Sequence, residues 1–162
     1  MLNMKKCKKI NKISKVKYLF NKNNEYFSDF NKRNGIEYIY LDIKNNKNVE
    51  EFLKNIKIKY AKEEYYSTNY IVDKKGRIYC MLKENIISYH TNNNIENLNS
   101  VGVVVLSNNM YINKKQSDSL KKIKKFLSRV YKKRLEYRLE YKVFSSIKPV
   151  KYYEKEYSIN FN

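Results

Sequence analysis

The stretch from Ser67 to Leu106 constrains the fold most, because it predicts a β-hairpin followed by a buried strand. Residues 67–72 and 77–82 are rich in β-branched and aromatic side chains, and they flank Asp73–Gly76, a turn whose glycine can adopt a positive φ. Asn99–Leu106 is a nearly continuous apolar run, which is typical of a strand covered on both faces. The stretch therefore predicts the centre of a β-sheet that lies between two layers.

Two capping signals predict a helix on each side of that stretch. Asn48 and Glu51 stand where a capping box places its residues, and Asn113 and Gln116 form a similar signal further along. Apolar residues recur at helical spacing after each signal. They are Val49, Phe52, Leu53, Ile56 and Tyr60 in the first helix, and Leu120, Ile123, Phe126, Leu127, Val130 and Tyr131 in the second.

Shorter signals predict the remaining elements. Glu37–Ile43 and Leu139–Phe144 have the β-branched and aromatic content of strands. Val16–Phe20 predicts a short edge strand, and residues 21–35 predict a loop that ends in an Asn-Gly turn.

The length of 162 residues fits one domain with its own core. We expect a basic N-terminal arm over residues 1–15 and a single α/β domain over residues 16–162. This domain should contain a central mixed β-sheet flanked by helices.

The chain is strongly basic, with 35 Lys and Arg residues against 16 Asp and Glu residues. Its positive potential attracts polyanions, so nucleic acid, teichoic-acid-bearing cell wall and anionic membrane surfaces are candidate partners. A bias towards Lys, Asn, Ile and Tyr also fits an A+T-rich genome, which accounts for part of this charge. The 17 tyrosines and 7 phenylalanines provide enough apolar surface for folding, which argues against a disordered chain.

The sequence predicts neither a signal peptide nor a transmembrane segment. Polar residues interrupt the segment after the first lysines, and no apolar run approaches the length of a membrane-spanning helix. Cys7 and Cys80 lack the spacing of metal ligands, so we interpret them as reduced, structural thiols. We therefore expect a protein that is cytoplasmic as synthesised.

Five motifs in order resemble the zinc-dependent N-acetylmuramoyl-L-alanine amidases, a family that includes amidase-type phage lysozymes and peptidoglycan recognition proteins. Members have a strand with His before Tyr or Phe, a D-x-x-G hairpin, an "IY" strand, a "WHA" segment and an "N-S-I-G-I-E-L" strand. The counterparts here are Thr68-Asn69-Tyr70, Asp73–Gly76, Ile78-Tyr79, Tyr89-His90-Thr91 and Asn99–Val105. The resemblance implies a mixed sheet with helices on both faces.

The zinc ligands of the family are replaced in this chain. A catalytic zinc needs three protein ligands and an open position for water. The resemblance places Asp42 at the first His ligand, offers Phe144 or Ser145 for the second, and finds no Cys or Asp near Tyr152 for the third. Asn69 replaces a further family His, and Val104 replaces a carboxylate. We therefore expect no zinc or other cofactor, and we lean against an enzyme.

The leading hypothesis is a catalytically degenerate amidase-like domain that binds peptidoglycan-type glycopeptides or acts as an interaction scaffold. The resemblance implies a substrate cleft around Asp42, Asn69, Tyr70, His90 and Asn93. Two structural alternatives remain open: His90 can be held by hydrogen bonds within the fold, and Asp42 can pair with a nearby lysine. An active amidase that uses Asp42 and His90 as atypical ligands is a third hypothesis.

A different hypothesis is a polyanion- or nucleic-acid-binding protein that uses a basic helix from Lys121 to Arg134. Its lysines and arginine can bind phosphates with a steep salt dependence, or they can form an ordinary solvated face. The candidate polyanion-binding residues are Lys121, Lys124, Lys125, Arg129, Lys132 and Lys133. The sequence contains no recognised nucleic-acid-binding motif, and the oligomeric state stays open.

Overall fold

The computed structural model describes residues 16–19, 28–140 and 142–152, so the expected basic arm over residues 1–15 lies outside the described part. The strands are β1 (Lys17–Tyr18), β2 (Ser28–Lys32), β3 (Tyr38–Lys44), β4 (Tyr70–Val72), β5 (Ile78–Cys80), β6 (Ile86–Ser88), β7 (Ser100–Leu106), β8 (Tyr137–Leu139) and β9 (Lys142–Phe144). The helices are α2 (Val49–Ala61), α3 (Asn94–Asn99) and α4 (Lys114–Val130).

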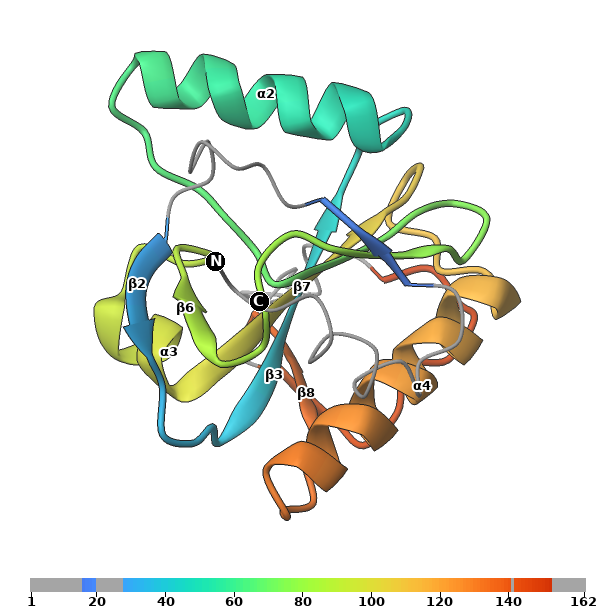
Figure 1. The fold of residues 1–162 in the computed structure, drawn as a ribbon. Helices are drawn as coiled ribbons and strands as arrows, with labels where there is room; N and C mark the ends of the chain where they lie inside the picture. The colour runs from blue at the N-terminus through green and yellow to red at the C-terminus, as the bar shows by residue number, and fades with distance from the viewer. Residues whose placement is uncertain (1–15, 20–27, 141, 153–162) are drawn as a thin grey trace, which may run out of the picture.

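A mixed seven-stranded sheet forms the centre of the molecule (Figure 1). Its order is β1-β5-β4-β7-β3-β8-β9, and β2 and β6 form a separate antiparallel ribbon. β7 pairs in parallel with β3 and β4, whereas β4 and β5 form the expected antiparallel hairpin. Every residue of β7 is buried, which confirms the predicted central strand.

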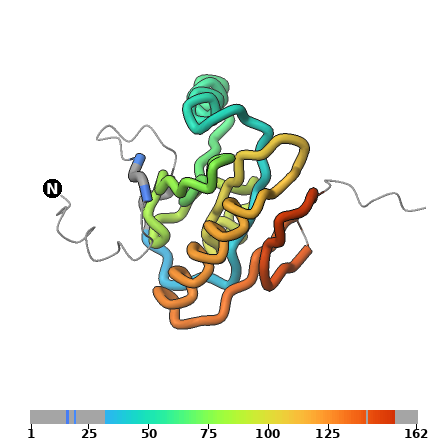
Figure 2. Tube along the Cα trace, turned by 90° about the vertical axis from the view of Figure 1, so that its right-hand side faces the viewer, coloured from blue at the N-terminus to red at the C-terminus, as the bar shows by residue number. Residues whose placement is uncertain are grey.

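The two long helices cover opposite faces of this sheet (Figures 1 and 2). Val103 and Val105 of β7 belong to the core that contains the apolar side of α4, whereas Val104 packs in a second core with Phe52 and Ile56 of α2. Successive residues of a strand point to opposite faces, so one apolar strand can contribute to both cores. The predicted α/β fold is therefore confirmed. None of the described helices has the length and apolar character needed to cross a bilayer.

Asp73 organises the hairpin turn. Its Oδ1 accepts hydrogen bonds from the N–H groups of Lys75 and Arg77, each at 2.9 Å, and its Oδ2 lies 2.5 Å from Arg77 Nε. Gly76 has a φ of 76°, and a Cβ there would lie 2.7 Å from the carbonyl oxygen of Lys115. The glycine is thus required both by the backbone conformation and by the close approach of α4.

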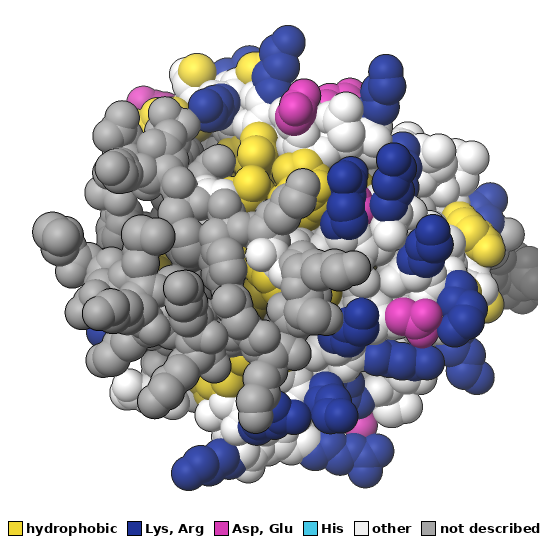
Figure 3. Space-filling model, turned by 45° about the vertical axis from the view of Figure 1, so that its right-hand side comes forward, with side chains coloured by type: hydrophobic (Ala, Val, Ile, Leu, Met, Phe, Trp, Pro, Cys, Tyr) yellow, Lys and Arg dark blue, Asp and Glu magenta, His cyan; other side chains and the backbone are white. Residues whose placement is uncertain are grey.

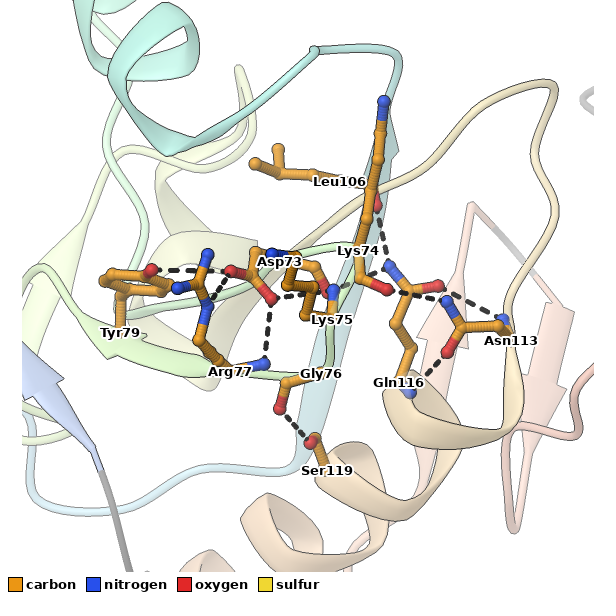
Figure 4. A network of polar contacts seen from close by, with 10 residues as sticks. All are labelled: Asp73, Lys74, Lys75, Gly76, Arg77, Tyr79, Leu106, Asn113, Gln116 and Ser119. Carbon is orange, nitrogen blue, oxygen red and sulfur yellow. Dashed lines mark hydrogen bonds and ion pairs between the residues drawn. The ribbon is translucent and has the colours of Figure 1, made fainter.

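The first turn of α4 holds this hairpin against the central strand (Figure 4). Gln116 donates from Nε2 to the carbonyl oxygens of Asp73 and Leu106, at 3.1 and 2.7 Å. Asn113 caps the helix and also donates to the carbonyl oxygen of Lys74 at 2.8 Å. The predicted capping box is present, and its two side chains also connect α4 to the sheet.

Two segments contain strands that differ from the prediction. The predicted loop over residues 21–35 was wrong in its second half, where β2 pairs with β6. Ser-Asp-Phe-Asn-Lys has little strand propensity, so the neighbouring edge of β6 determines its conformation. The single strand predicted over Leu139–Phe144 was also wrong. β8 and β9 form a hairpin that turns at Glu140, whose φ is 56°.

Two helix details also differ from the prediction. The basic helix ends at Val130, because Tyr131 is its C-cap and Lys132 adopts a φ of 50°, so residues 132–134 lie beyond α4. In α2, Asn48 accepts from Glu51 N as expected, but the Glu51 carboxylate accepts from Lys47 N at 2.5 Å, one residue before the cap.

Candidate functional site

A hollow of about 560 Å³ lies where the segment after α2 meets the segment after β6. Three tyrosines line it together with amide, hydroxyl and charged side chains. We call it the tyrosine hollow. Its lining residues are Lys59, Glu63, Glu64, Tyr65, Tyr66, Tyr89, Thr91, Asn92 and Asn94.

The two walls of the tyrosine hollow are set by helix ends. α2 terminates at its C-cap, Lys62, and Glu63 adopts a φ of 60°, so the chain turns out of the helix just before the tyrosine pair. On the other wall, the side chain of Asn93 caps α3 by accepting from Ile95 N and Glu96 N, at 2.9 and 3.2 Å. The side-chain oxygen of Asn93 is used in this cap, and its two neighbours, Asn92 and Asn94, line the hollow.

Asp42 lies behind the hollow and is bound to one of its tyrosines. Tyr66 donates from its hydroxyl to Asp42 Oδ2 at 3.0 Å, and Lys44 Nζ lies 3.0 Å from the same oxygen. Burial, followed by the negative charge of Asp42, raises the pKa of Tyr66 well above its ordinary value. The Tyr66 hydroxyl therefore stays protonated as a donor, and Asp42 fixes its direction.

His90 is buried and held by two serines. Its Nδ1 lies 2.8 Å from Ser88 Oγ, and its Nε2 lies 2.7 Å from Ser100 Oγ. The ring packs against Gly102, where a Cβ would lie only 2.6 Å from His90 Cγ. Burial, with the positive charge of Arg33 as a second cause, lowers the pKa of His90 to about 3. The imidazole is therefore neutral at physiological pH.

Asn69 joins three segments beneath the site. Its Nδ2 donates to the carbonyl oxygens of Lys83 and Ile86, at 2.8 and 2.9 Å. Its Oδ1 accepts from Ser88 Oγ and Gly102 N, at 2.8 and 3.0 Å. With no exposed surface of its own, Asn69 connects the hairpin to β6 and β7.

The five candidate cleft residues thus fall into two groups. Asp42 and Asn93 lie beside the tyrosine hollow through the contacts described above, whereas Asn69, Tyr70 and His90 are buried. Tyr70 belongs to the core beneath α4, and its hydroxyl donates to Glu84 Oε2 at 3.1 Å.

In the part of the chain that the structure describes, the donor side chains do not fit a catalytic zinc. Among the described residues, no group of three or more His, Cys, Asp and Glu side chains could hold a metal ion. β8 runs parallel to β3 with Leu139 beside Leu41, so Glu140, rather than the expected Phe144 or Ser145, follows at the level of Asp42. Phe144 pairs with Tyr137, nearer the other end of β3.

The candidate polyanion-binding residues do not form one continuous helical face. Lys121, Lys124 and Lys125 line a second hollow beside α4. Arg129 is exposed in the last turn of α4, and Lys132 and Lys133 lie beyond that helix. The side chain of Lys133 pairs with Glu37.

The sequence analysis missed the three tyrosines of the hollow. Tyr65 and Tyr66 belong to the connection between α2 and β4, and Tyr89 directly precedes His90. The available signal was a pair of adjacent tyrosines in an otherwise polar connection. It did not identify the third tyrosine, because the two segments meet only in the folded chain.

The family model for N-acetylmuramoyl-L-alanine amidases matches residues 32–147. Among solved structures, the chain is similar to the N-acetylmuramoyl-L-alanine amidase LysC from Clostridium intestinale, with a TM-score of 0.60, 19% identity and coverage of 77% of this chain and 81% of that one. None of the curated proteins matches this chain.

Peptidoglycan recognition proteins have similar structures. Bumblebee PGRP-SA gives a TM-score of 0.60 at 14% identity, covering 76% of this chain and 81% of that one. Drosophila PGRP-LB, solved in complex with tracheal cytotoxin, gives 0.52 at 17% identity, covering 70% of this chain and 74% of that one. These similarities agree with the mixed sheet and its two helical layers.

Proposed function

The chain belongs to the N-acetylmuramoyl-L-alanine amidase family, and we propose that it is a catalytically degenerate member. In this proposal it binds peptidoglycan-type glycopeptides in the tyrosine hollow. The observation that carries the proposal is the composition of this hollow beside Asp42, to which the sequence resemblance assigns the family's first ligand position.

The tyrosine hollow has the size and chemistry for a sugar joined to a short peptide. Its volume of about 560 Å³ lies within the usual range of ligand pockets. Tyrosine rings offer flat apolar faces to sugar rings and hydroxyls to their polar edges. Lys59 can pair with a peptide carboxylate, while Glu63 and Glu64 can pair with an amine.

The buried polar residues support the hollow rather than contact the ligand. Asn69 and His90 fix β6 and β7 beneath it, and Asp42 orients the hydroxyl of Tyr66. Asn93 caps α3 and so positions the asparagines on either side of it. These roles use the candidate residues for positioning and require no metal.

Binding is tested by calorimetric titration with a soluble disaccharide–tetrapeptide. The double variant Tyr65→Ala/Tyr89→Ala should bind at least tenfold more weakly, because it removes two of the three rings. Tyr111→Ala is the matched control, since Tyr111 is 51% exposed, close to the 54% of Tyr65, but lies outside the hollow. Unchanged affinity of the double variant, or an equal loss in the control, would contradict this site.

Degeneracy is tested separately with intact peptidoglycan. We expect no release of peptides, whether zinc or a chelator is added, because the described donor set does not provide three ligands. Zinc-dependent release would overturn the loss of catalysis and would favour the atypical-ligand hypothesis. Asp42→Ala and His90→Ala would then identify the ligands.

A further inference from the structure

A second, smaller hollow of about 250 Å³ runs between α4 and the segment after β9. We call it the basic groove. One side consists of Lys121, Lys124, Lys125 and Ser128, and the other of Ser145 and Ser146. Tyr137 and Ile147, both buried, complete the lining.

The helical residues of the basic groove are spaced so that they share one side of α4. They stand at positions i, i+3, i+4 and i+7, which a helix places on adjacent turns of the same face. Lys124 donates to the carbonyl oxygen of Ser145, which joins the two sides of the groove. The three lysines therefore lie along one face of α4 and are not distributed around the helix.

Charge around the basic groove is almost entirely positive. Residues 114–134 contain ten Lys and Arg residues and one acidic residue, Asp118. Asp118 is shared between Lys114 and Lys121, at 3.3 and 4.0 Å. Figure 3 shows basic side chains gathered on the α4 side of the molecule with few acidic ones among them. Within the described ranges, no carboxylate forms an ion pair with Lys124 or Lys125.

The groove also offers hydroxyl donors. Ser128, Ser145 and Ser146 contribute three side-chain hydroxyls to its lining, and none of the hydrogen bonds recorded between described residues uses them. Ammonium and hydroxyl groups together match the acceptor oxygens of a phosphate, which bind charged donors strongly. The ammonium group of a lysine acts as a point charge, and the serine hydroxyls add hydrogen bonds with a defined direction.

From these observations we propose that the basic groove binds the phosphates of a phosphodiester polymer without bases, a polyol phosphate. Proteins that bind single-stranded nucleic acid use exposed aromatic rings on which bases stack. The only ring in this lining, Tyr137, is 1% exposed, and its hydroxyl is bonded to the carbonyl oxygen of Leu120. The lining therefore recognises phosphate and polyol hydroxyls but provides no stacking surface. This site is separate from the tyrosine hollow and does not depend on its function.

The test is fluorescence anisotropy of the full chain with a labelled poly(glycerol phosphate) of defined length, at several salt concentrations. The triple variant Lys121→Gln/Lys124→Gln/Lys125→Gln should bind at least tenfold more weakly at low salt. The slope of log affinity against log salt should decrease by about two, since each lost phosphate contact contributes about 0.7 for a single strand. The double variant Ser145→Ala/Ser146→Ala should lose several-fold in affinity with the slope unchanged.

The matched control, Lys54→Gln/Lys62→Gln/Lys122→Gln, removes the same charge from exposed positions outside the groove. Equal losses of affinity in the two triple variants would overturn the groove site, because they would indicate non-specific electrostatic attraction to the whole surface. Tighter binding of single-stranded DNA than of poly(glycerol phosphate), at equal phosphate concentration, would overturn the choice of a base-free polymer. Tyr65→Ala/Tyr89→Ala should leave this binding unchanged, so failure of the groove and failure of the tyrosine hollow are distinguishable.

Discussion

At the scale of single residues, Gly102 determines whether the buried imidazole fits. A Cβ at this position would lie 2.6 to 2.8 Å from three atoms of His90. The ring is held on both sides by serine hydroxyls, so it cannot move away freely.

We expect Gly102→Ala to lower the free energy of unfolding by about 1–3 kcal/mol, the usual effect of overpacking a core. Urea denaturation measures this change. Gly35→Ala is the control, because nothing lies within 4 Å of a Cβ there. Its stability should be unchanged or up to about 1 kcal/mol higher. Equal effects of the two substitutions would contradict the close packing of His90.

The low pKa of His90 predicts a loss of stability in acid. The folded chain keeps this imidazole neutral down to a pKa of about 3, whereas the unfolded chain protonates it below its ordinary value of 6.5. Its contribution is therefore fully present above pH 6.5 and decreases as the pH falls towards 3, with a limiting slope of about 1.4 kcal/mol per pH unit.

The measurement is urea denaturation of the wild type and His90→Gln at pH 7, 5 and 4. Glutamine can hydrogen-bond to the same serines but does not titrate in this range, so the difference in stability between the two proteins should shift in favour of the variant as the pH falls. Parallel pH profiles would mean that His90 is protonated equally in both states.

At the scale of elements, the cap of α4 should contribute more than the cap of α2. Asn113 accepts from Gln116 N and also donates to Lys74 in the hairpin turn, whereas the Asn48 side chain accepts from Glu51 N within its own helix. Asn113→Ala removes a cap and a contact between elements, so we expect a loss of about 2 kcal/mol against about 1 kcal/mol for Asn48→Ala. Thermal or urea unfolding of both variants checks the order. A larger loss from Asn48→Ala would show that the contact with the hairpin contributes little.

Elements with strong periodicity were predictable from sequence, whereas those that depend on a partner were not. β7 is buried throughout and apolar after Ser100, and both long helices carry a cap and an apolar stripe, so local signals agree with the final fold. β2 has a polar sequence and exists through its pairing with β6. The tyrosine hollow could not be predicted either, because its walls come from two connections that meet only in the folded chain.

At the scale of the whole molecule, α2 and α4 cover opposite faces of the sheet, and each of the two proposed sites adjoins one of them. We expect the sites to bind independently, because the intervening sheet is a rigid, buried layer. Saturation with the disaccharide–tetrapeptide should change the affinity for poly(glycerol phosphate) by less than about twofold, as measured by anisotropy. A larger change in either direction would indicate coupling between the sites, which must then be reciprocal.

The parallel pairing of β3 with β7 also has a consequence for how the chain folds. It joins Tyr38 to Ser100 and Lys44 to Leu106, so a long loop must close before this ladder forms. The β4–β5 hairpin, by contrast, joins residues that are close in sequence and can form early. We therefore expect the centre of the sheet to form late in folding, because β3 is synthesised well before its partner β7.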